Sequence, residues 1–348
     1  MGTFPIMKKE NHHQFNAANE RIKYRYRIHI RRSLKKDEKS IIAALKHIRD
    51  FEIFIGFANF TVFNEAVADR YIVHMFNKQL SASYINDNIR ILKEFLQWLE
   101  RQRGYKSKIN YNHIDYLNIS TNQKNMAKAS EYKKSYIYDQ ILKAIRLMAE
   151  QTIIQKRDKA LISLQALSGL RISELRTIKM KNLIQEEGNY FVYVNPKDMV
   201  VKYAKTRHAN FLPLTKDIMN NLLNWKDYLL KIGFKDKDPL FPRIDCKFNQ
   251  FNLLESKITH EQLKSNTTIR DIFKAAFNGA GYEYIRPHSF RHTLVRFAEK
   301  QSPEFLNAVR QSLSHSSINT TFQSYGQLSE TEQRNRIATL KFNFDPIK

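Results

Sequence analysis

The chain has 348 residues, of which 42% are hydrophobic and 12% aromatic, a composition that supports folded cores and excludes an intrinsically disordered chain. Lysine and arginine number 58 against 34 acidic residues, so the formal net charge is +24. A surplus of this size predicts a polyanionic partner, with nucleic acid favoured over an anionic membrane surface. The length predicts two domains.

The one cysteine, Cys246, excludes an intrachain disulfide framework and a thiolate zinc site. No stretch approaches the roughly 18 apolar residues of a membrane-spanning helix. The N-terminus also lacks the apolar core of a signal peptide. We therefore expect a cytoplasmic protein with no membrane partner.

Residues 1–38 are polar and basic and are predicted to form a basic N-terminal arm. Within them, residues 21–32 interleave isoleucine and tyrosine with arginine, which fits either a short strand or helix start, or an arm lying along phosphates. Residues 39–103 are predicted to form a small helical, DNA-binding domain. Its clearest helix has five apolar residues at helical spacing, namely Ile85, Ile89, Leu92, Leu96 and Leu99.

Residues 104–133 lose this periodicity and become rich in Asn, Ser, Lys and Gln, so they are predicted to be a linker. The second domain is expected over residues 134–348. A strand is predicted at 189–196, a hairpin at 200–214 and irregular structure at 233–266. Helices are predicted at 136–149, 156–168, from Thr215, at 268–278, 289–300 and 303–313, and from Ser329. The expected fold class is mainly α, with one small antiparallel β-sheet in the second domain.

Several polar residues of the second domain lie at places where a side chain of that type is unusual. Arg171 follows Gly169 at a turn between two helical patterns, and Lys205 lies in the predicted hairpin. The others are His288 and Arg291, one helical turn apart, and His315, ten residues before Tyr325. Each has an ordinary explanation alone, such as a helix start, a capped histidine, a solvated turn or packing.

Together these residues form a cationic set with one potential nucleophile, which suits the chemistry of a phosphodiester. A guanidinium matches two phosphate oxygens bidentately and does not titrate. Arginine and histidine donors stabilise the negative charge that develops on phosphorus. A tyrosine hydroxyl can form a covalent phosphoester, while histidine and lysine can move protons.

The set resembles the tyrosine recombinases, the λ-integrase-like site-specific recombinases, across roughly residues 39–342. "SGLRISELRTIKMKNL" is similar to the family's first arginine box and "HSFRHT" to its second. "LSHSSINTTFQSYG" is similar to the third, although Ser314 stands where glycine is common. "KTRHANFLPL" is similar to the family's lysine hairpin, in which Lys205 matches the lysine and Lys202 remains a rival.

The resemblance implies a core-binding domain followed by a catalytic domain, and catalysis by six residues. Tyr325 would attack DNA to form a 3′-phosphotyrosine, without a metal ion, ATP or any other cofactor. It also implies a synaptic tetramer on double-stranded DNA, with the C-terminal helix docked on a neighbouring subunit; docking on its own domain is the alternative. The implied catalytic residues are Arg171, Lys205, His288, Arg291, His315 and Tyr325.

Two other functions remain open at this point. A type IB topoisomerase would use the same chemistry to relax supercoils, and a DNA-binding regulator could keep the fold without cutting. Within the recombinases, both integration or excision of a mobile element and resolution of DNA dimers fit the sequence.

Overall fold

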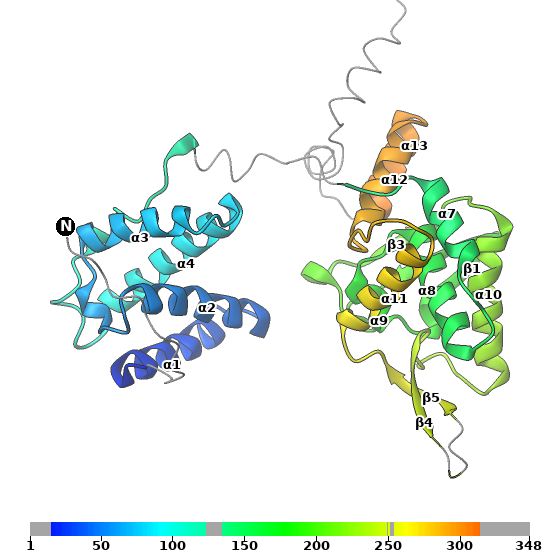
Figure 1. Cartoon of the computed structure of the whole chain (residues 1–348), viewed down its shortest axis with the longest axis horizontal. Helices are drawn as coiled ribbons and strands as arrows, with labels where there is room; N and C mark the ends of the chain where they lie inside the picture. Colours follow the sequence, from blue (N-terminus) through cyan, green and yellow to red (C-terminus); the bar gives the residue numbers. More distant parts are fainter. Residues whose placement is uncertain (1–14, 123–133, 249, 251–253, 314–348) are drawn as a thin grey trace, which may run out of the picture. The chain divides into compact units, whose positions relative to one another are not determined.

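The structure is a computed structural model that describes residues 15–122, 134–248, 250 and 254–313. The chain divides into two compact units, Met1–Ala129 and Ser130–Lys348, each with its own hydrophobic core (Figure 1). Both units are mostly helical, and the second also has antiparallel strands, which confirms the predicted mainly α fold class; the described residues form two small sheets rather than the one expected. Among the described residues, no helix has the length and apolarity needed to cross a membrane.

The first unit is a helical bundle in which α2, α3 and α4 pack around aromatic side chains. Phe51 and Tyr71 are fully buried, with ring centroids 5.0 Å apart in an edge-to-face arrangement. Its helices are α1 (Ala17–Arg32), α2 (Glu38–Phe54), α3 (Glu65–Asn77), α4 (Ala82–Glu100) and the short α5 (Tyr111–Ile114).

Helix α1 corrects the prediction of an N-terminal arm for residues 17–32 and agrees with the helix start that the sequence left open for residues 21–32. Residues 1–14 lie outside the described residues. Ile22, Tyr26 and Ile30 recur every four residues and are buried in the core of the first unit. The Tyr26 ring lies 5.0 Å from the ring of Phe95 in α4. The alternation of apolar and basic residues concealed this helical face, because the same residues also fit a period of two.

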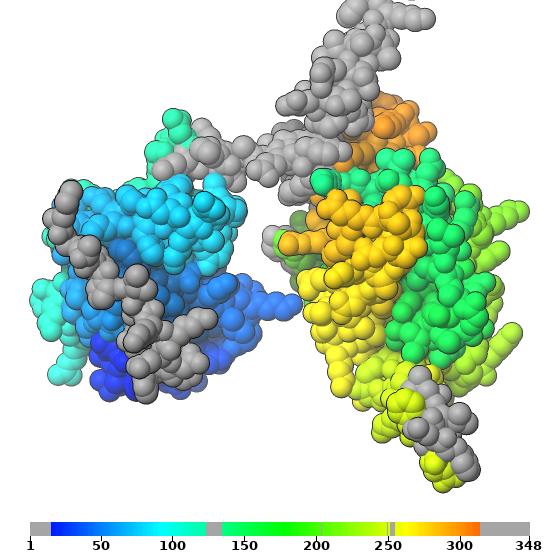
Figure 2. Space-filling model, in the orientation of Figure 1, coloured from blue at the N-terminus to red at the C-terminus, as the bar shows by residue number. Residues whose placement is uncertain are grey.

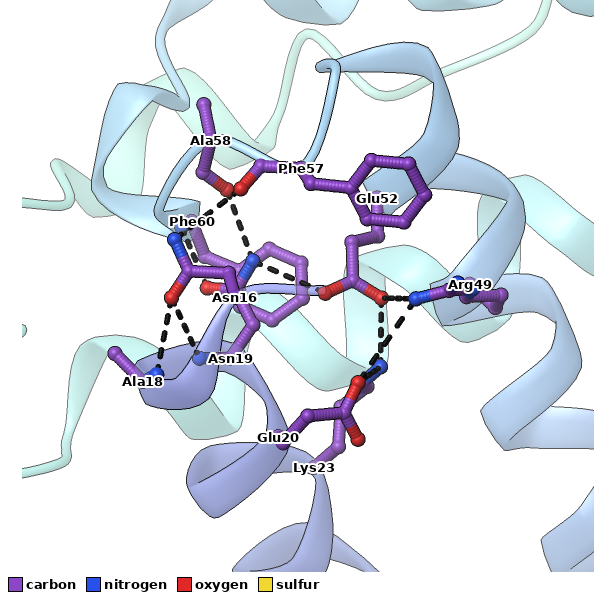
Figure 3. A network of polar contacts seen from close by, with 10 residues as sticks. All are labelled: Asn16, Ala18, Asn19, Glu20, Lys23, Arg49, Glu52, Phe57, Ala58 and Phe60. Atoms are coloured by element: carbon purple, nitrogen blue, oxygen red, sulfur yellow. Dashed lines mark hydrogen bonds and ion pairs between the residues drawn. The ribbon is translucent and has the colours of Figure 1, made fainter. Parts of the chain in front are cut away.

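A buried polar network joins α1 to α2 and to the turn that follows α2 (Figure 3). The Glu52 carboxylate is fully buried and accepts hydrogen bonds from Lys23 Nζ at 2.6 Å and Arg49 Nη1 at 2.9 Å. Asn19 Nδ2 donates to Glu52 Oε1 and to the Ala58 carbonyl, at 3.2 and 2.9 Å. Removing one member of a buried charged group leaves the others unpaired, so the network ties α1 firmly to the bundle.

Replacing Glu52 with glutamine is expected to destabilise the first unit by about 3 kcal/mol, because it removes the buried negative charge at the centre of this network. The matched control is Glu38→Gln on the same helix, since Glu38 pairs with Arg27 and Arg31 at the exposed surface and should matter little. Hydrogen exchange of α1 and α2 peptides across a urea series measures both. Equal effects of the two substitutions would contradict the assigned role of Glu52.

The predicted linker over residues 104–133 is also corrected in part. Tyr105, Ile109, Ile114, Leu117 and Ile119 are all buried in the core of the first unit. Residues 105–119 therefore belong to the first unit. Their polar side chains lie mostly at its surface. Residues 123–133 lie outside the described residues.

The second unit places its helices around α8, which is buried along its last turns. Every residue from 160 to 168 is buried, and the helix packs against α7, α10 and β3. The helices of this unit are α7 (Tyr138–Leu147), α8 (Ile153–Ser168), α9 (Ile172–Thr177), α10 (Lys216–Lys231), α11 (Asn266–Gly279), α12 (Ser289–Glu299) and α13 (Pro303–Ser312). The predicted helices at 136–149, 156–168, 268–278, 289–300 and 303–313 are thus confirmed within a few residues.

A three-stranded antiparallel sheet contains β1 (Leu183–Glu186), β2 (Asn189–Val194) and β3 (Arg207–Asn210), with β2 in the middle. Val192 of β2 pairs with residue 183 on one side and Ala209 on the other. The predicted strand at 189–196 is confirmed. The predicted hairpin at 200–214 is wrong in detail, because only its second arm is a strand and this strand pairs with β2.

A second hairpin, of β4 (Pro242–Phe248) and β5 (Leu254–Gln262), replaces the irregular structure predicted at 233–266. Most side chains of the two strands are exposed or half-buried, and β5 is largely polar. Figure 2 shows the hairpin extending from the helical body of the second unit. Low burial explains why the sequence pattern was weak, since a strand without a buried face lacks a clear apolar alternation.

Candidate active site

The turn between α8 and α9 depends on Gly169, whose backbone is left-handed, with φ of 60°. Its N–H donates to the Gln165 carbonyl at 2.9 Å and ends α8. A Cβ atom at this position would lie 3.2 Å from side-chain atoms of both Leu294 and Leu313. The left-handed backbone favours glycine at this helix end, and close packing adds a second reason for glycine.

Replacing Gly169 with alanine is expected to lower the free energy of unfolding of the second unit by about 3 kcal/mol, from backbone strain and overpacking together. Gly188→Ala is the matched control, because Gly188 also has a positive φ of 79° but open space around its Cβ position. Gly188→Ala should lower the free energy of unfolding only by the backbone strain, about 1 kcal/mol. Urea unfolding compares the two, and an equal loss would show that packing at Gly169 has no effect.

Arg171 precedes α9 (Ile172–Thr177) and closes its first turn with Glu174. The Arg171 main-chain N–H donates to Glu174 Oε2 at 2.7 Å, and Nη1 donates to Oε1 at 3.1 Å. Among the described residues, no other group hydrogen-bonds the Arg171 side chain, which is 19% exposed. The remaining N–H groups of its guanidinium can therefore reach a ligand at the surface.

The Glu174 carboxylate has no exposed surface and is held mainly by Arg207, the first residue of β3. Arg207 Nη1 and Nη2 donate to Oε1 and Oε2 at 2.9 and 2.6 Å in a bidentate pair. Arg207 Nε also donates to the Ser312 carbonyl at the end of α13, at 2.9 Å. One carboxylate thus lies between two arginines that come from different elements.

Burial by itself raises the pKa of the Glu174 carboxyl, since it disfavours the charged form. The hydrogen bonds and charge of Arg207, with smaller contributions from Arg171, outweigh this effect and hold the pKa below its ordinary value. Glu174 is therefore ionised at neutral pH, and its charge is balanced by Arg207.

Arg291 in α12 is fully buried, and its guanidinium hydrogen-bonds the turn between α8 and α9. Its Nη1 donates to the Gly169 carbonyl and its Nη2 to the Leu313 carbonyl, each at 2.8 Å. Arg291 therefore contacts the turn that carries Arg171. Because Arg291 has no exposed surface, contact with a phosphate requires the residues that cover it to move.

His288 and the two candidate lysines lie at the surface. His288 is the exposed residue before α12, and its ring lies 5.8 Å from that of His292 in a perpendicular arrangement. Lys202 is the first residue of a short 3₁₀ helix just before β3, Lys205 follows that helix, and both are exposed. The structure therefore does not decide between the two lysines.

His315 and Tyr325 lie outside the described residues, which end at Leu313 before the third box. Two residues that the sequence pattern did not indicate, Arg207 and Asn210, form hydrogen bonds with Ser312 at the end of α13. Arg207 binds the Ser312 carbonyl, and Ser312 Oγ accepts a hydrogen bond from the Asn210 main-chain N–H at 3.0 Å. The sequence does contain a signal for Arg207. In an alternating strand Arg207 lies on the same face as Ala209, and this face is buried. A buried arginine needs a carboxylate partner.

A match to a family model identifies the family of this chain. Residues 135–332, more than half of the chain, match the model described as "Phage integrase family". The chain belongs to the phage integrase family. As a member of this family of tyrosine recombinases, it is a site-specific recombinase, and nothing in the comparisons favours a topoisomerase or an inactive regulator.

Individual relatives of this integrase family member agree in sequence and in fold. The tyrosine recombinase XerC of Rickettsia prowazekii is 26% identical over 293 residues, which cover 82% of this chain and 84% of that protein. A crystal structure of XerH recombinase bound to a palindromic difH substrate has a TM-score of 0.63 at 17% identity, covering 86% of this chain and 79% of that one. A λ integrase tetramer bound to a Holliday junction has a TM-score of 0.57 at 16% identity, covering 88% and 82%.

Proposed function

We propose that the six residues named from the sequence carry out strand cleavage by this recombinase, with Tyr325 as the nucleophile. The observation that carries the proposal is the hydrogen bond from the Arg291 guanidinium to the carbonyl of Gly169, which lies two residues before Arg171 in the same turn. Two permanent cations at one turn form a site for a phosphodiester. The partly exposed Arg171 presents free guanidinium N–H groups to the phosphate, and Arg291 would join it there once the residues that cover Arg291 move.

In the proposed cleavage step, the Tyr325 oxygen attacks phosphorus and forms a 3′-phosphotyrosine bond as the bond to the 5′-oxygen breaks. His288 assists removal of the phenolic proton, and Lys205 gives a proton to the leaving 5′-oxygen. Arg171, Arg291 and His315 stabilise the charge on the non-bridging oxygens. The 5′-hydroxyl of another strand then attacks the phosphotyrosine and releases Tyr325, so the number of phosphoester bonds is conserved.

The proposed partner is double-stranded DNA, bound chiefly through phosphate contacts of this highly basic chain. The first unit serves as the core-binding domain and the second as the catalytic domain. Because the similar λ integrase assembly is a tetramer on a Holliday junction, we extend the same assembly to this chain. The helix predicted from Ser329, outside the described residues, would dock on a neighbouring subunit. The enzyme would act in the cytoplasm, on mobile-element DNA or on DNA dimers.

The deciding experiment traps the covalent intermediate on a nicked duplex that carries the recombination site. The site can be found first by footprinting on the DNA that flanks the gene. After cleavage the short 5′-hydroxyl fragment diffuses away, so the protein stays attached to the DNA 3′ end. We expect an adduct that survives denaturation and forms equally in EDTA; absence of any adduct on a footprinted site would overturn the proposal.

A further inference from the structure

Arg207 is a buried arginine that connects three segments around the candidate site. Its side chain is 4% exposed, and it is the first residue of β3 (Arg207–Asn210), two residues after Lys205. Its guanidinium binds Glu174 at the start of α9 and the Ser312 carbonyl at the end of α13. The segments that carry the candidate lysine, the first arginine and the approach to the third box are therefore fixed to one side chain.

The charges around Glu174 show what Arg207 does for Arg171. Glu174 is fully buried and ionised, so it needs a cation, and both arginines are within reach. Arg207 takes both carboxylate oxygens, at 2.9 and 2.6 Å, and the Arg171 side chain makes only one longer bond, at 3.1 Å. Without Arg207, Glu174 would be balanced by Arg171 alone, and a bidentate pair would turn the Arg171 guanidinium inward.

We propose that Arg207 is a positioning residue for strand cleavage: it neutralises Glu174, so that the Arg171 guanidinium stays directed at the scissile phosphate. This inference rests on the proposed role of Arg171. Arg207 itself does not touch the DNA. Its second contact, to the Ser312 carbonyl, holds β3 and the end of α13 in one arrangement around the same carboxylate.

The test compares Arg207→Gln, Glu174→Gln and the double variant by the rate of covalent adduct formation on the nicked duplex. Arg207→Gln should slow cleavage by about 100-fold, the effect of a small misplacement of a reacting group. Its DNA affinity should be unchanged, because the residue is buried. The double variant should cleave at least about tenfold faster than Arg207→Gln, since the uncharged glutamine that replaces Glu174 no longer captures Arg171.

Arg157→Gln is the matched control for loss of a buried arginine. Arg157 is 6% exposed, binds Asp158 through Nε and Nη2, and donates from Nη1 to the Pro242 carbonyl. It should lower the melting temperature as Arg207→Gln does but leave the cleavage rate of the folded protein unchanged. If Arg207→Gln does not fold, Arg207→Lys keeps the charge and should slow cleavage by about tenfold, because an ammonium cannot bind Glu174 bidentately.

The outcomes separate this inference from the function on which it rests. A double variant no faster than Arg207→Gln, or equal losses in Arg207→Gln and Arg157→Gln, would overturn the positioning role while the wild-type adduct still supports the proposed function. Normal cleavage by Arg207→Lys and Arg207→Gln would do the same. A wild-type chain that forms no adduct would overturn the proposed function, and this inference with it.

Discussion

Replacing Tyr325 with phenylalanine is expected to abolish the covalent adduct with nicked DNA while leaving DNA affinity unchanged. The substitution removes one oxygen atom, the one that attacks phosphorus in the proposed mechanism, and a phenylalanine ring cannot form a phosphoester. Affinity should persist because it comes mainly from lysine and arginine contacts with phosphates, which the substitution does not touch. Denaturing gels measure the adduct, and titration at fixed salt measures the affinity.

Tyr228→Phe is the control, since Tyr228 is an exposed tyrosine on α10 in the same unit. This variant should form the adduct at the wild-type rate. Digestion of the wild-type adduct should leave the nucleotide on the peptide that contains residue 325. Adduct formation by Tyr325→Phe, or attachment to a different peptide, would remove Tyr325 from the mechanism.

Replacing Arg171 with lysine is expected to slow strand cleavage by about 100- to 1000-fold, the cost of losing one preorganised donor to a developing oxyanion. The charge is kept, but an ammonium cannot bridge two phosphate oxygens and hold Glu174 at the same time. DNA affinity should change little, because one phosphate contact among many is altered rather than lost. Single-turnover cleavage on the nicked duplex, with protein in excess, gives the rate directly.

Arg176→Lys is the control for this prediction, because Arg176 lies on the same helix, is also half-buried and donates to the Leu263 carbonyl at 3.1 Å. It should cleave at the wild-type rate. Retained cleavage by Arg171→Lys would mean that Arg171 only closes the first turn of α9 with Glu174. Equal losses in the two variants would point to the stability of α9 rather than to phosphate binding.

Much of the second unit follows from local sequence signals, because these signals coincide with the packing. Gly169 ends α8 both in the pattern and in the structure, and Arg171 begins the next helix as expected. Ile218, Leu222, Trp225 and Leu229, at helical spacing, all face the core from α10. Helices with one apolar stripe are the elements that a sequence identifies best.

The remaining features depend on contacts between residues that are distant in the sequence. Residues 21–32 fit two periods equally, and only packing against α2 and α4 selects the helix. The β4–β5 hairpin has little buried surface to impose a pattern. The pairing of Arg207 with Glu174 spans 33 residues and joins a strand to a helix, so spacing alone does not indicate it.

The hydrogen bonds of Arg207 and Arg291 at the end of α13 also limit the distance between that end and Tyr325, the proposed nucleophile. Arg207 and Arg291 donate hydrogen bonds to the adjacent carbonyls of Ser312 and Leu313, so the last described residues after α13 are fixed to the body of the second unit. Tyr325 lies 325 − 313 = 12 residues later, and at about 3.5 Å per residue its backbone lies within roughly 40 Å of Leu313 by any path. With Tyr325 as the proposed nucleophile, every phosphate that this subunit cuts must therefore lie within that distance of Leu313 plus the length of one tyrosine side chain.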